Sequence, residues 1–207
     1  MGGTLAEETL VAAYRRGIFP WYSAGQPILW WSPDPRAILT PDDFHASRSL
    51  IRNLRRQPWR VTIDCEFAFV VQACAVPRRN QDDTWLTPAM QAAYLRLHRA
   101  GFAHSLECWL ENELVGGIYG VAIGRIFFGE SMFSRVDDGS KVALYALCRR
   151  LMRWGYRLLD CQIMSSHLER LGCSRLRREQ FVAVVSANCA LSVAQEAWAQ
   201  SLMFEIP

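Results

Sequence analysis

The chain has 207 residues, of which 51% are hydrophobic, and this is enough to bury a core and form one domain, or one domain with a smaller appendage. No apolar run is long enough to cross a bilayer and no signal peptide is visible, so a cytoplasmic protein without a membrane partner is expected. Seven cysteines without a CxxC pair and histidines without metal-ligand spacing predict neither a metal site nor a cofactor. The net charge is +3, and arginine supplies nearly all of the positive charge. Arginine suits phosphate and carboxylate partners.

The first 58 residues are predicted to form a small N-terminal α/β domain. Its first helix spans 4–17, where Thr4 and Glu7 have capping-box spacing and Gly17 suits a left-handed C-cap. Residues 17–36 contain four prolines and are too irregular for a long helix. Trp21, which follows a Phe-Pro pair, is therefore a candidate platform on which a nucleobase stacks.

A second helix is predicted over 47–57, with Leu50, Ile51 and Leu54 on one apolar stripe. Four arginines lie off that stripe: Arg48, Arg52, Arg55 and Arg56. A solvated basic face is the usual explanation of such a run, and a surface that follows a phosphate backbone is the alternative.

A second domain is predicted over 59–207. It begins with a strand at 59–64 and includes a helix opened by Thr87 and Pro88, three strands between 103 and 131, a helix at 140–154 ended by Gly155, and a strand at 156–162. The last twenty or so residues are expected to be a helical tail. This order predicts an α+β fold with a mixed central sheet, the order of GNAT-type acyltransferases, although order alone identifies a fold weakly.

The stretch R-I-F-F-G-E-S-M-F-S-R (125–135) places Glu130 among bulky apolar residues. A carboxylate in such surroundings is costly unless it is solvated, paired or used in function. A surface pair with Arg125 or Arg135 is the simple explanation. Strict alternation puts Phe127 on the opposite face from Glu130 and Met132, so a pocket shared by all three requires a bulge near Gly129.

The strand 156–162 carries the second group of polar candidates. Alternation places Leu158, Asp160 and Gln162 on one face of a strand that is otherwise apolar. An aspartate held by backbone donors or by an arginine is one interpretation, and an active-site acid is the other.

These features occur together in a series of ordered motifs. They are A-Y-R-R-G-I-F-P-W (13–21), I-L-W-W-S-P-D-P-R (28–36), T-W-L-T-P-A-M (84–90), L-V-G-G-I-Y-G-V-A (114–122), F-F-G-E-S-M-F-S-R (127–135), S-K-V-A-L (140–144) and L-D-C-Q (159–162). The series resembles the bacterial leucyl/phenylalanyl-tRNA–protein transferases over about residues 10–172. The resemblance implies a small N-terminal domain on a GNAT-like domain.

It also implies a reaction. Leucine or phenylalanine, and possibly methionine, is transferred from aminoacyl-tRNA to proteins whose N-terminal residue is Arg or Lys, and the new residue marks these proteins for degradation. The ester is already activated, so the enzyme mainly aligns an amine against it and provides a base.

The resemblance also assigns residues. Asp160 and Gln162 would lie at the reacting amine, and Glu130 would help to receive the basic N-terminal residue. The pocket for the transferred amino acid would be lined by Phe127, Met132, Ile118 and Leu147. The site for the terminal adenosine of the tRNA would be lined by Trp21, Trp85 and Tyr94. The acceptor stem would contact Arg48, Arg52, Arg55 and Arg56.

Two other functions compete with this one. An acyl-CoA-dependent GNAT acetyltransferase would need an R/Q-x-x-G-x-G/A loop, which residues 133–142 lack. A non-catalytic RNA-binding protein would need only the arginine face and the tryptophans.

Overall fold

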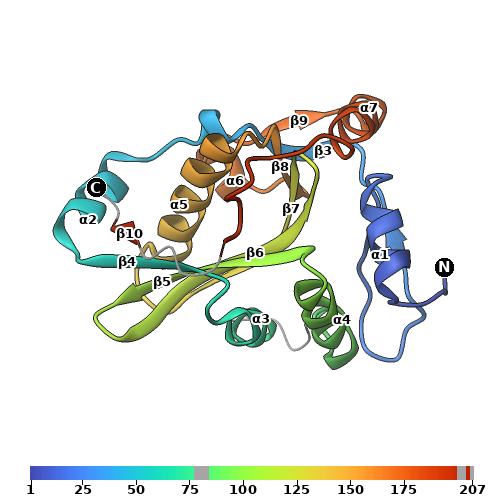
Figure 1. Cartoon of the computed structure of the whole chain (residues 1–207), viewed down its shortest axis with the longest axis horizontal. Helices are drawn as coiled ribbons and strands as arrows, with labels where there is room; N and C mark the ends of the chain where they lie inside the picture. The colour runs from blue at the N-terminus through green and yellow to red at the C-terminus, as the bar shows by residue number, and fades with distance from the viewer. Residues whose placement is uncertain (77–83, 200–203, 206–207) are drawn as a thin grey trace.

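The computed structural model describes residues 1–76, 84–199 and 204–205. In this part of the chain a mixed sheet has eight strands in the order β10-β4-β5-β6-β7-β8-β3-β9, and β1 and β2 form a separate pair (Figure 1). The strands are β1 (Phe19–Pro20), β2 (Trp30–Trp31), β3 (Arg36–Leu39), β4 (Trp59–Ile63), β5 (Ala103–Leu110), β6 (Glu113–Ile123), β7 (Ile126–Ser134), β8 (Leu158–Gln162), β9 (Ser174–Leu176) and β10 (Phe204–Glu205). The prediction of an α+β fold with a mixed sheet is confirmed.

The helices pack around this sheet as two groups. Their bounds are α1 (Glu7–Tyr14), α2 (Arg48–Arg56), α3 (Phe67–Ala75), α4 (Pro88–Arg99), α5 (Gly139–Trp154), α6 (Ser166–Arg170) and α7 (Arg178–Asn188), with a 3-10 turn at Pro41–Asp43. One apolar cluster joins α1, α3, α4 and α7 to the sheet, and we call it the α4 cluster. The other joins α2 and α5 to the sheet, and we call it the α5 cluster. In Figure 1, α5 and α3–α4 lie on opposite sides of the sheet, as two such clusters require.

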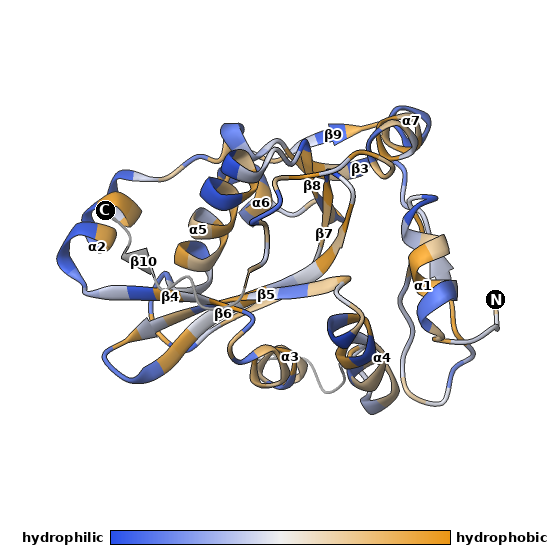
Figure 2. Ribbon diagram, viewed as in Figure 1, coloured by the Kyte–Doolittle hydropathy of each residue, from blue (hydrophilic) through white to orange (hydrophobic). Residues whose placement is uncertain are grey.

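The hydropathy of the ribbon follows this arrangement. In Figure 2 the hydrophobic colour dominates the middle of the sheet, whereas α2 carries both hydrophilic and hydrophobic residues. Leu50 and Leu54 of α2 are buried against the α5 cluster, so the predicted apolar stripe of this helix is confirmed.

Local capping signals explain several helix ends. Thr87 accepts a hydrogen bond from the Met90 amide at 3.3 Å at the start of α4, and Gly155 ends α5 with φ 81°. Gly17 also has a positive φ of 72°. The capping box at Thr4 is wrong, because α1 begins at Glu7 with Ala6 as its N-cap, and the Thr4 hydroxyl accepts from the Ala6 amide at 3.4 Å and not from the Glu7 amide.

Strand β3 comes from the N-terminal segment but lies inside the central sheet, between β8 and β9. It pairs with β8 through Ile38 and Asp160, and with β9 through Ile38 and Ser174. The division of the chain at residue 58 stays a prediction, and the pairing of β3 with β8 and β9 joins the two parts.

The C-terminal segment differs from the expected helical tail. Helix α7 ends at Asn188, and residues 189–199 form turns and irregular backbone. Residues 200–203 and 206–207 of the predicted tail lie outside the described residues. In place of a helix, the segment brings Trp198 against the rings of Phe127 and Trp154, at centroid distances of 5.4 and 4.8 Å.

Candidate active site

Strand β7 contains a bulge at Glu130. Tyr119 of β6 faces Ser131 and the next residue, Gly120, faces Gly129, so Glu130 has no partner in the ladder. One extra residue shifts the alternation by one position, so residues an odd number of positions apart across the bulge lie on the same face of the sheet. Phe127 and Met132 therefore both pack in the α5 cluster despite their odd spacing. The predicted bulge near Gly129 is confirmed.

Three side chains donate hydrogen bonds to the Glu130 carboxylate. Tyr14 and Gln162 donate to Oε1 at 2.7 and 3.0 Å, and Tyr94 donates to Oε2 at 2.6 Å. Neither nearby arginine pairs with it: Arg125 donates to the Ser192 carbonyl at 2.9 Å, and Arg135 lies over the Phe69 ring. The simple explanation by a surface ion pair is therefore wrong.

The environment of Glu130 favours its neutral form. The pKa of Glu130 is raised to about 7, chiefly because burial disfavours the charged form; hydrogen bonds from Tyr94 and Tyr14 and the charge of Arg36 oppose this rise, and the charge of Asp160 adds to it. A carboxyl group with this pKa exchanges protons near neutral pH, as a general base must.

Asp160 is held in a different way. Arg36 grips it with two bonds, from Nε to Oδ1 at 2.8 Å and from Nη2 to Oδ2 at 2.6 Å, and both side chains are completely buried. The backbone amide of Gln162 also donates to Oδ1, at 2.9 Å. The interpretation of Asp160 as a buried acid held by an arginine and a backbone donor is confirmed.

Strands β7 and β8 bring these acids together. They run parallel, and their last paired residues, Phe128 and Asp160, each lie two positions before Glu130 and Gln162. Gln162 has a left-handed backbone conformation with φ 61°, which is uncommon for a residue other than glycine. Its side chain reaches Glu130, so the three predicted polar residues form one connected group.

A cavity of about 530 Å³ opens between β6, β7, β8 and helices α5 and α6. Its apolar walls are Ile118, Met132, Leu144, Leu159, Ile163 and Leu168. Glu130 lies at its edge. The volume and the lining are typical of a site for a small, mostly apolar group.

A narrower cleft of about 90 Å³ adjoins this cavity and shares Glu130 and Ile163 with it. It is lined by Phe19, Pro20, Trp21, Trp85, Glu130, Gln162 and Ile163. Trp21 is 41% exposed, and its indole contacts Trp31 edge-on at 6.2 Å. Trp21 and Trp85, which lie 64 positions apart in the sequence, thus line the same cleft as Glu130 and Gln162.

Three of the predicted pocket residues do not line either opening. Phe127 and Leu147 are buried in the α5 cluster behind the cavity. Tyr94 is also completely buried, and its hydroxyl bonds to Glu130 and to Tyr14 at 3.1 Å. Tyr94 therefore contacts Glu130 from the protein interior and does not line the adenosine site.

The comparisons with known proteins agree with this geometry. The family model for leucyl/phenylalanyl-tRNA protein transferase matches residues 38–186, and the model for the N-terminal domain of the same family matches residues 3–34. The chain belongs to the leucyl/phenylalanyl-tRNA protein transferase family. It is therefore an aminoacyltransferase, and its substrates are an aminoacyl-tRNA and a protein.

Individual relatives extend over nearly the whole chain. A leucyl/phenylalanyl-tRNA–protein transferase of Methylococcus capsulatus is 55% identical over 198 residues, covering 96% of this chain and 84% of the relative. One from Pseudomonas fluorescens is 55% identical over 180 residues, covering 87% and 80%. A solved structure of L-PGS from Bacillus licheniformis has 11% identity and a TM-score of 0.48, covering 75% of this chain and 65% of that one, which is too low to assign a fold family.

The arginines predicted to bind tRNA in this transferase lie away from the polar group. Arg48, Arg52, Arg55 and Arg56 are all exposed on α2. In Figure 1 this helix lies at the opposite end of the molecule from α1. A tRNA is long enough to contact both regions, so the separation is compatible with one ligand.

Two residues of the site were missed by the sequence prediction. Tyr14 donates to Glu130 from α1, and Arg36 holds Asp160 from β3. Each lies in a motif of the resemblance, A-Y-R-R-G and S-P-D-P-R. The available signal was Arg36 itself, an arginine opening the apolar run R-A-I-L, because a buried cation needs an acidic partner.

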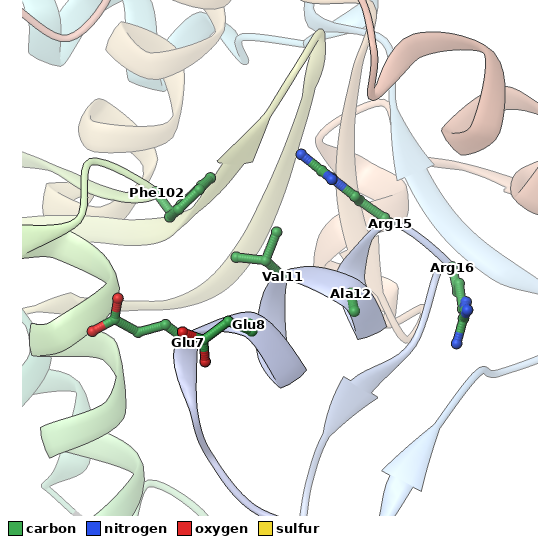
Figure 3. Close-up of a pocket in the computed structure, with 7 residues that line it drawn as sticks. All are labelled: Glu7, Glu8, Val11, Ala12, Arg15, Arg16 and Phe102. Atoms are coloured by element: carbon green, nitrogen blue, oxygen red, sulfur yellow. The ribbon is translucent and has the colours of Figure 1, made fainter.

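A further groove of about 480 Å³ lies along α1 and contains none of the predicted site residues. Figure 3 shows Glu7 and Glu8 at one end of the helix and Arg15 and Arg16 at the other, with Phe102 across the groove. These charges match the helix dipole of α1, because acids are favourable at the N-terminal end of a helix and arginines at its C-terminal end. They need no ligand as explanation.

The fold also brings together Asp64, His98 and His104, which the sequence did not predict as a group. His104 Nδ1 lies 2.7 Å from Asp64 Oδ2, and His98 Nδ1 lies 2.8 Å from the Ala103 carbonyl. The other Asp64 oxygen accepts from the Ser105 amide at 2.8 Å. Hydrogen bonds thus engage the ring and carboxylate atoms that would otherwise be free to bind a metal.

None of the helices in the described part of the chain combines the length and apolar character that a bilayer crossing needs.

Proposed function

We propose that this transferase moves leucine or phenylalanine from an aminoacyl-tRNA to the α-amino group of proteins whose N-terminal residue is Arg or Lys, which marks them for degradation. One observation carries the proposal. Glu130, an acid with which no arginine of the described residues forms an ion pair, lies where an apolar cavity meets a cleft lined by two tryptophans. An apolar acyl group, a nucleobase and a cationic amine each find matching chemistry there.

The apolar cavity would receive the side chain of the transferred amino acid. Ile118 and Met132 form its walls from the sheet, and Leu144 and Leu168 close it from α5 and α6. Burying such a side chain contributes about 1.5–3 kcal/mol. Phe127 and Leu147 would act from behind this wall, by determining its shape.

The tryptophan cleft would hold the terminal adenosine of the tRNA. Stacking of a base on an aromatic side chain contributes about 1–3 kcal/mol and requires no particular sequence. Trp21 and Trp85 offer such surfaces beside Glu130. The ester bond between adenosine and amino acid would then lie at the junction of the two openings.

The acceptor protein would place its cationic terminus at Glu130. The other acid of the group, Asp160, is already bound by Arg36, so Glu130 is the carboxylate that remains to attract an ammonium or guanidinium group. Glu130, Asp160 and Gln162 together are the proposed catalytic group. The exposed arginines of α2 are the proposed contact for the phosphates of the acceptor stem.

We also propose that the segment 59–207 is a GNAT-like domain preceded by a small N-terminal domain over 1–58. The order of helices and strands after residue 58 supports this, as does the pairing of β7 and β8 in parallel beside the proposed catalytic group.

The test supplies tRNA charged with labelled Phe and a peptide that begins with Arg. The expected result is label on the peptide, and none on the same peptide with an acetylated N-terminus. Absence of transfer while the tRNA remains charged would overturn the proposal. A clear thermal stabilisation of the protein by CoA, without transfer, would instead favour the acyl-CoA-dependent alternative.

A further inference from the structure

The two acids of the proposed catalytic group differ in how accessible they are. The side chain of Asp160 has no exposed surface, and Arg36 grips both of its oxygens in an ion pair. A substrate amine therefore cannot approach the Asp160 carboxylate without displacing Arg36 or the Gln162 amide. Asp160 also borders the cavity but has no accessible surface, whereas Glu130 is partly exposed and lines both the cavity and the cleft.

Arg36 is held as firmly as the acid that it binds. The guanidinium lies 4.7 Å from the centre of the Phe19 ring and 4.5 Å from that of Phe181. Arg36 is completely buried, and its Nη1 has no hydrogen-bond partner among the described residues. Two aromatic faces stabilise a buried cation that cannot lose its proton. The pair of Arg36 and Asp160 is thus part of the rigid frame.

That frame positions Gln162. Its amide donates to Asp160, and this bond supports the left-handed backbone at φ 61°. The same residue directs its side-chain amide to Glu130 Oε1 at 3.0 Å. The chain of contacts runs from Arg36 through Asp160 and Gln162 to Glu130.

This inference rests on the proposed function. We propose that Glu130 takes the proton from the acceptor's α-ammonium group, and that Arg36 is a positioning residue that holds Asp160 and Gln162 in place beside it. Tyr14 and Tyr94 are the donors that keep the Glu130 carboxylate oriented toward the junction.

The step balances as follows. One proton moves from the α-ammonium group to a Glu130 oxygen, and the nitrogen lone pair forms a C–N bond with the ester carbonyl carbon. The C–O bond to the ribose then breaks, its electron pair stays on the ribose oxygen, and a second amine proton moves to that oxygen. The third proton remains on the new amide. Glu130 returns its proton to solvent.

The pKa of Glu130 suits this role. Because burial raises it to about 7, Glu130 accepts a proton near neutral pH, where an α-amine with a pKa of about 8 is still mostly protonated. An acid at its ordinary pKa would be a weaker base for the same amine.

The experiment measures single-turnover transfer from Phe-tRNA to an Arg-led peptide between pH 5.5 and 8.5. In the wild type the rate should fall about tenfold per pH unit below pH 7. Glu130→Gln should lose about 10²–10⁴-fold in kcat and lose this limb, leaving only the titration of the peptide's amine. Glu113→Gln, which removes an exposed acid at the start of β6, should leave the profile unchanged.

The positioning role makes a separate expectation. Arg36→Met should lower kcat and keep the acid limb, moved to higher pH because the charge of Arg36 lowers the pKa of Glu130. Arg36→Lys, which keeps the cation, should recover part of the loss. Glu130→Asp provides a second variant that keeps an acid, and should retain a limb at reduced kcat. Circular dichroism verifies that each variant is folded.

A readout independent of activity is the ¹³C titration of the Glu130 carboxyl group in wild-type protein, expected near pH 7. The inference would be overturned, while the proposed function stands, by either of two results with folded Glu130→Gln. One is a pH profile that keeps the limb near pH 7, and the other is a changed KM for the peptide with an unchanged kcat. Absence of transfer by the wild type would overturn the proposed function and the inference with it.

Discussion

Arg36 and Asp160, 124 positions apart in the sequence, form a completely buried ion pair in which Arg36 Nη2 lies 2.6 Å from Asp160 Oδ2. It joins β3 of the N-terminal segment to β8. Removing one partner of a buried pair leaves an uncompensated charge, which is more costly than removing both.

A double-mutant cycle follows from this pair. Arg36→Met alone and Asp160→Leu alone should each lower the free energy of unfolding by about 3–5 kcal/mol, and the double variant should lose less than either single variant. Urea denaturation measures all three. The partly exposed pair of Lys141 and Asp138, also at 2.6 Å, is the control and should show a coupling of about 1 kcal/mol or less. Additive losses at Arg36 and Asp160 would contradict the expectation.

Stability should also depend on pH through Glu130. Its folded pKa of about 7 lies above the ordinary value of 4.5, so the folded state binds the proton more tightly than the unfolded state. The resulting stabilisation is complete below about pH 4.5 and is lost as the pH rises through 7.

Glu130→Gln removes this dependence. The free energy of unfolding of the variant minus that of the wild type should increase by up to about 3 kcal/mol as the pH rises from 4.5 to 8. Urea denaturation at the two pH values measures the gain. Glu113→Gln, at an exposed position, should show the same difference from the wild type at both. An equal effect of Glu130→Gln at both pH values would show that Glu130 does not titrate in this range.

The apolar cavity should determine which amino acid is transferred. Met132 lines it, and Met132→Trp reduces its volume, so Phe-tRNA should lose more than Leu-tRNA. One or two carbon atoms in an apolar pocket change kcat/KM by about 10–200-fold. Competition between the two charged tRNAs measures the ratio. Met152→Trp, on the exposed side of α5, should leave the ratio unchanged.

The arginines of α2 should contribute to tRNA affinity through phosphate contacts. Arg52→Gln and Arg55→Gln should each weaken binding for all tRNA sequences and lower the salt dependence, log Kd against log salt, by about 0.7–0.9. Filter binding at several salt concentrations measures it. Arg16→Gln, two residues after the end of α1, removes the same charge and is the control; α1 lies at the other end of the molecule from α2 in Figure 1. Equal effects at both ends would indicate general attraction and no specific contact by α2.

Much of the architecture was predictable because its causes are local. The ends of α4 and α5 depend on Thr87 and Gly155, whose preferences act within one helical turn. The bulge at Glu130 was predictable because Phe127 and Met132 cannot share a face under strict alternation. The ordered motifs were enough to predict the family.

The sequence alone thus determined the reaction class and the strands that carry Glu130, Asp160 and Gln162. Only the tertiary structure decided what each acid can do, because burial and partner choice depend on which distant segments pack together. Tyr14, 116 positions away from Glu130, orients that acid, and the insertion of β3 beside β8 brings Arg36 to Asp160. Two carboxylates of similar intrinsic acidity therefore acquire different environments: Asp160 is enclosed by its arginine, and Glu130 faces the site with a pKa near neutrality.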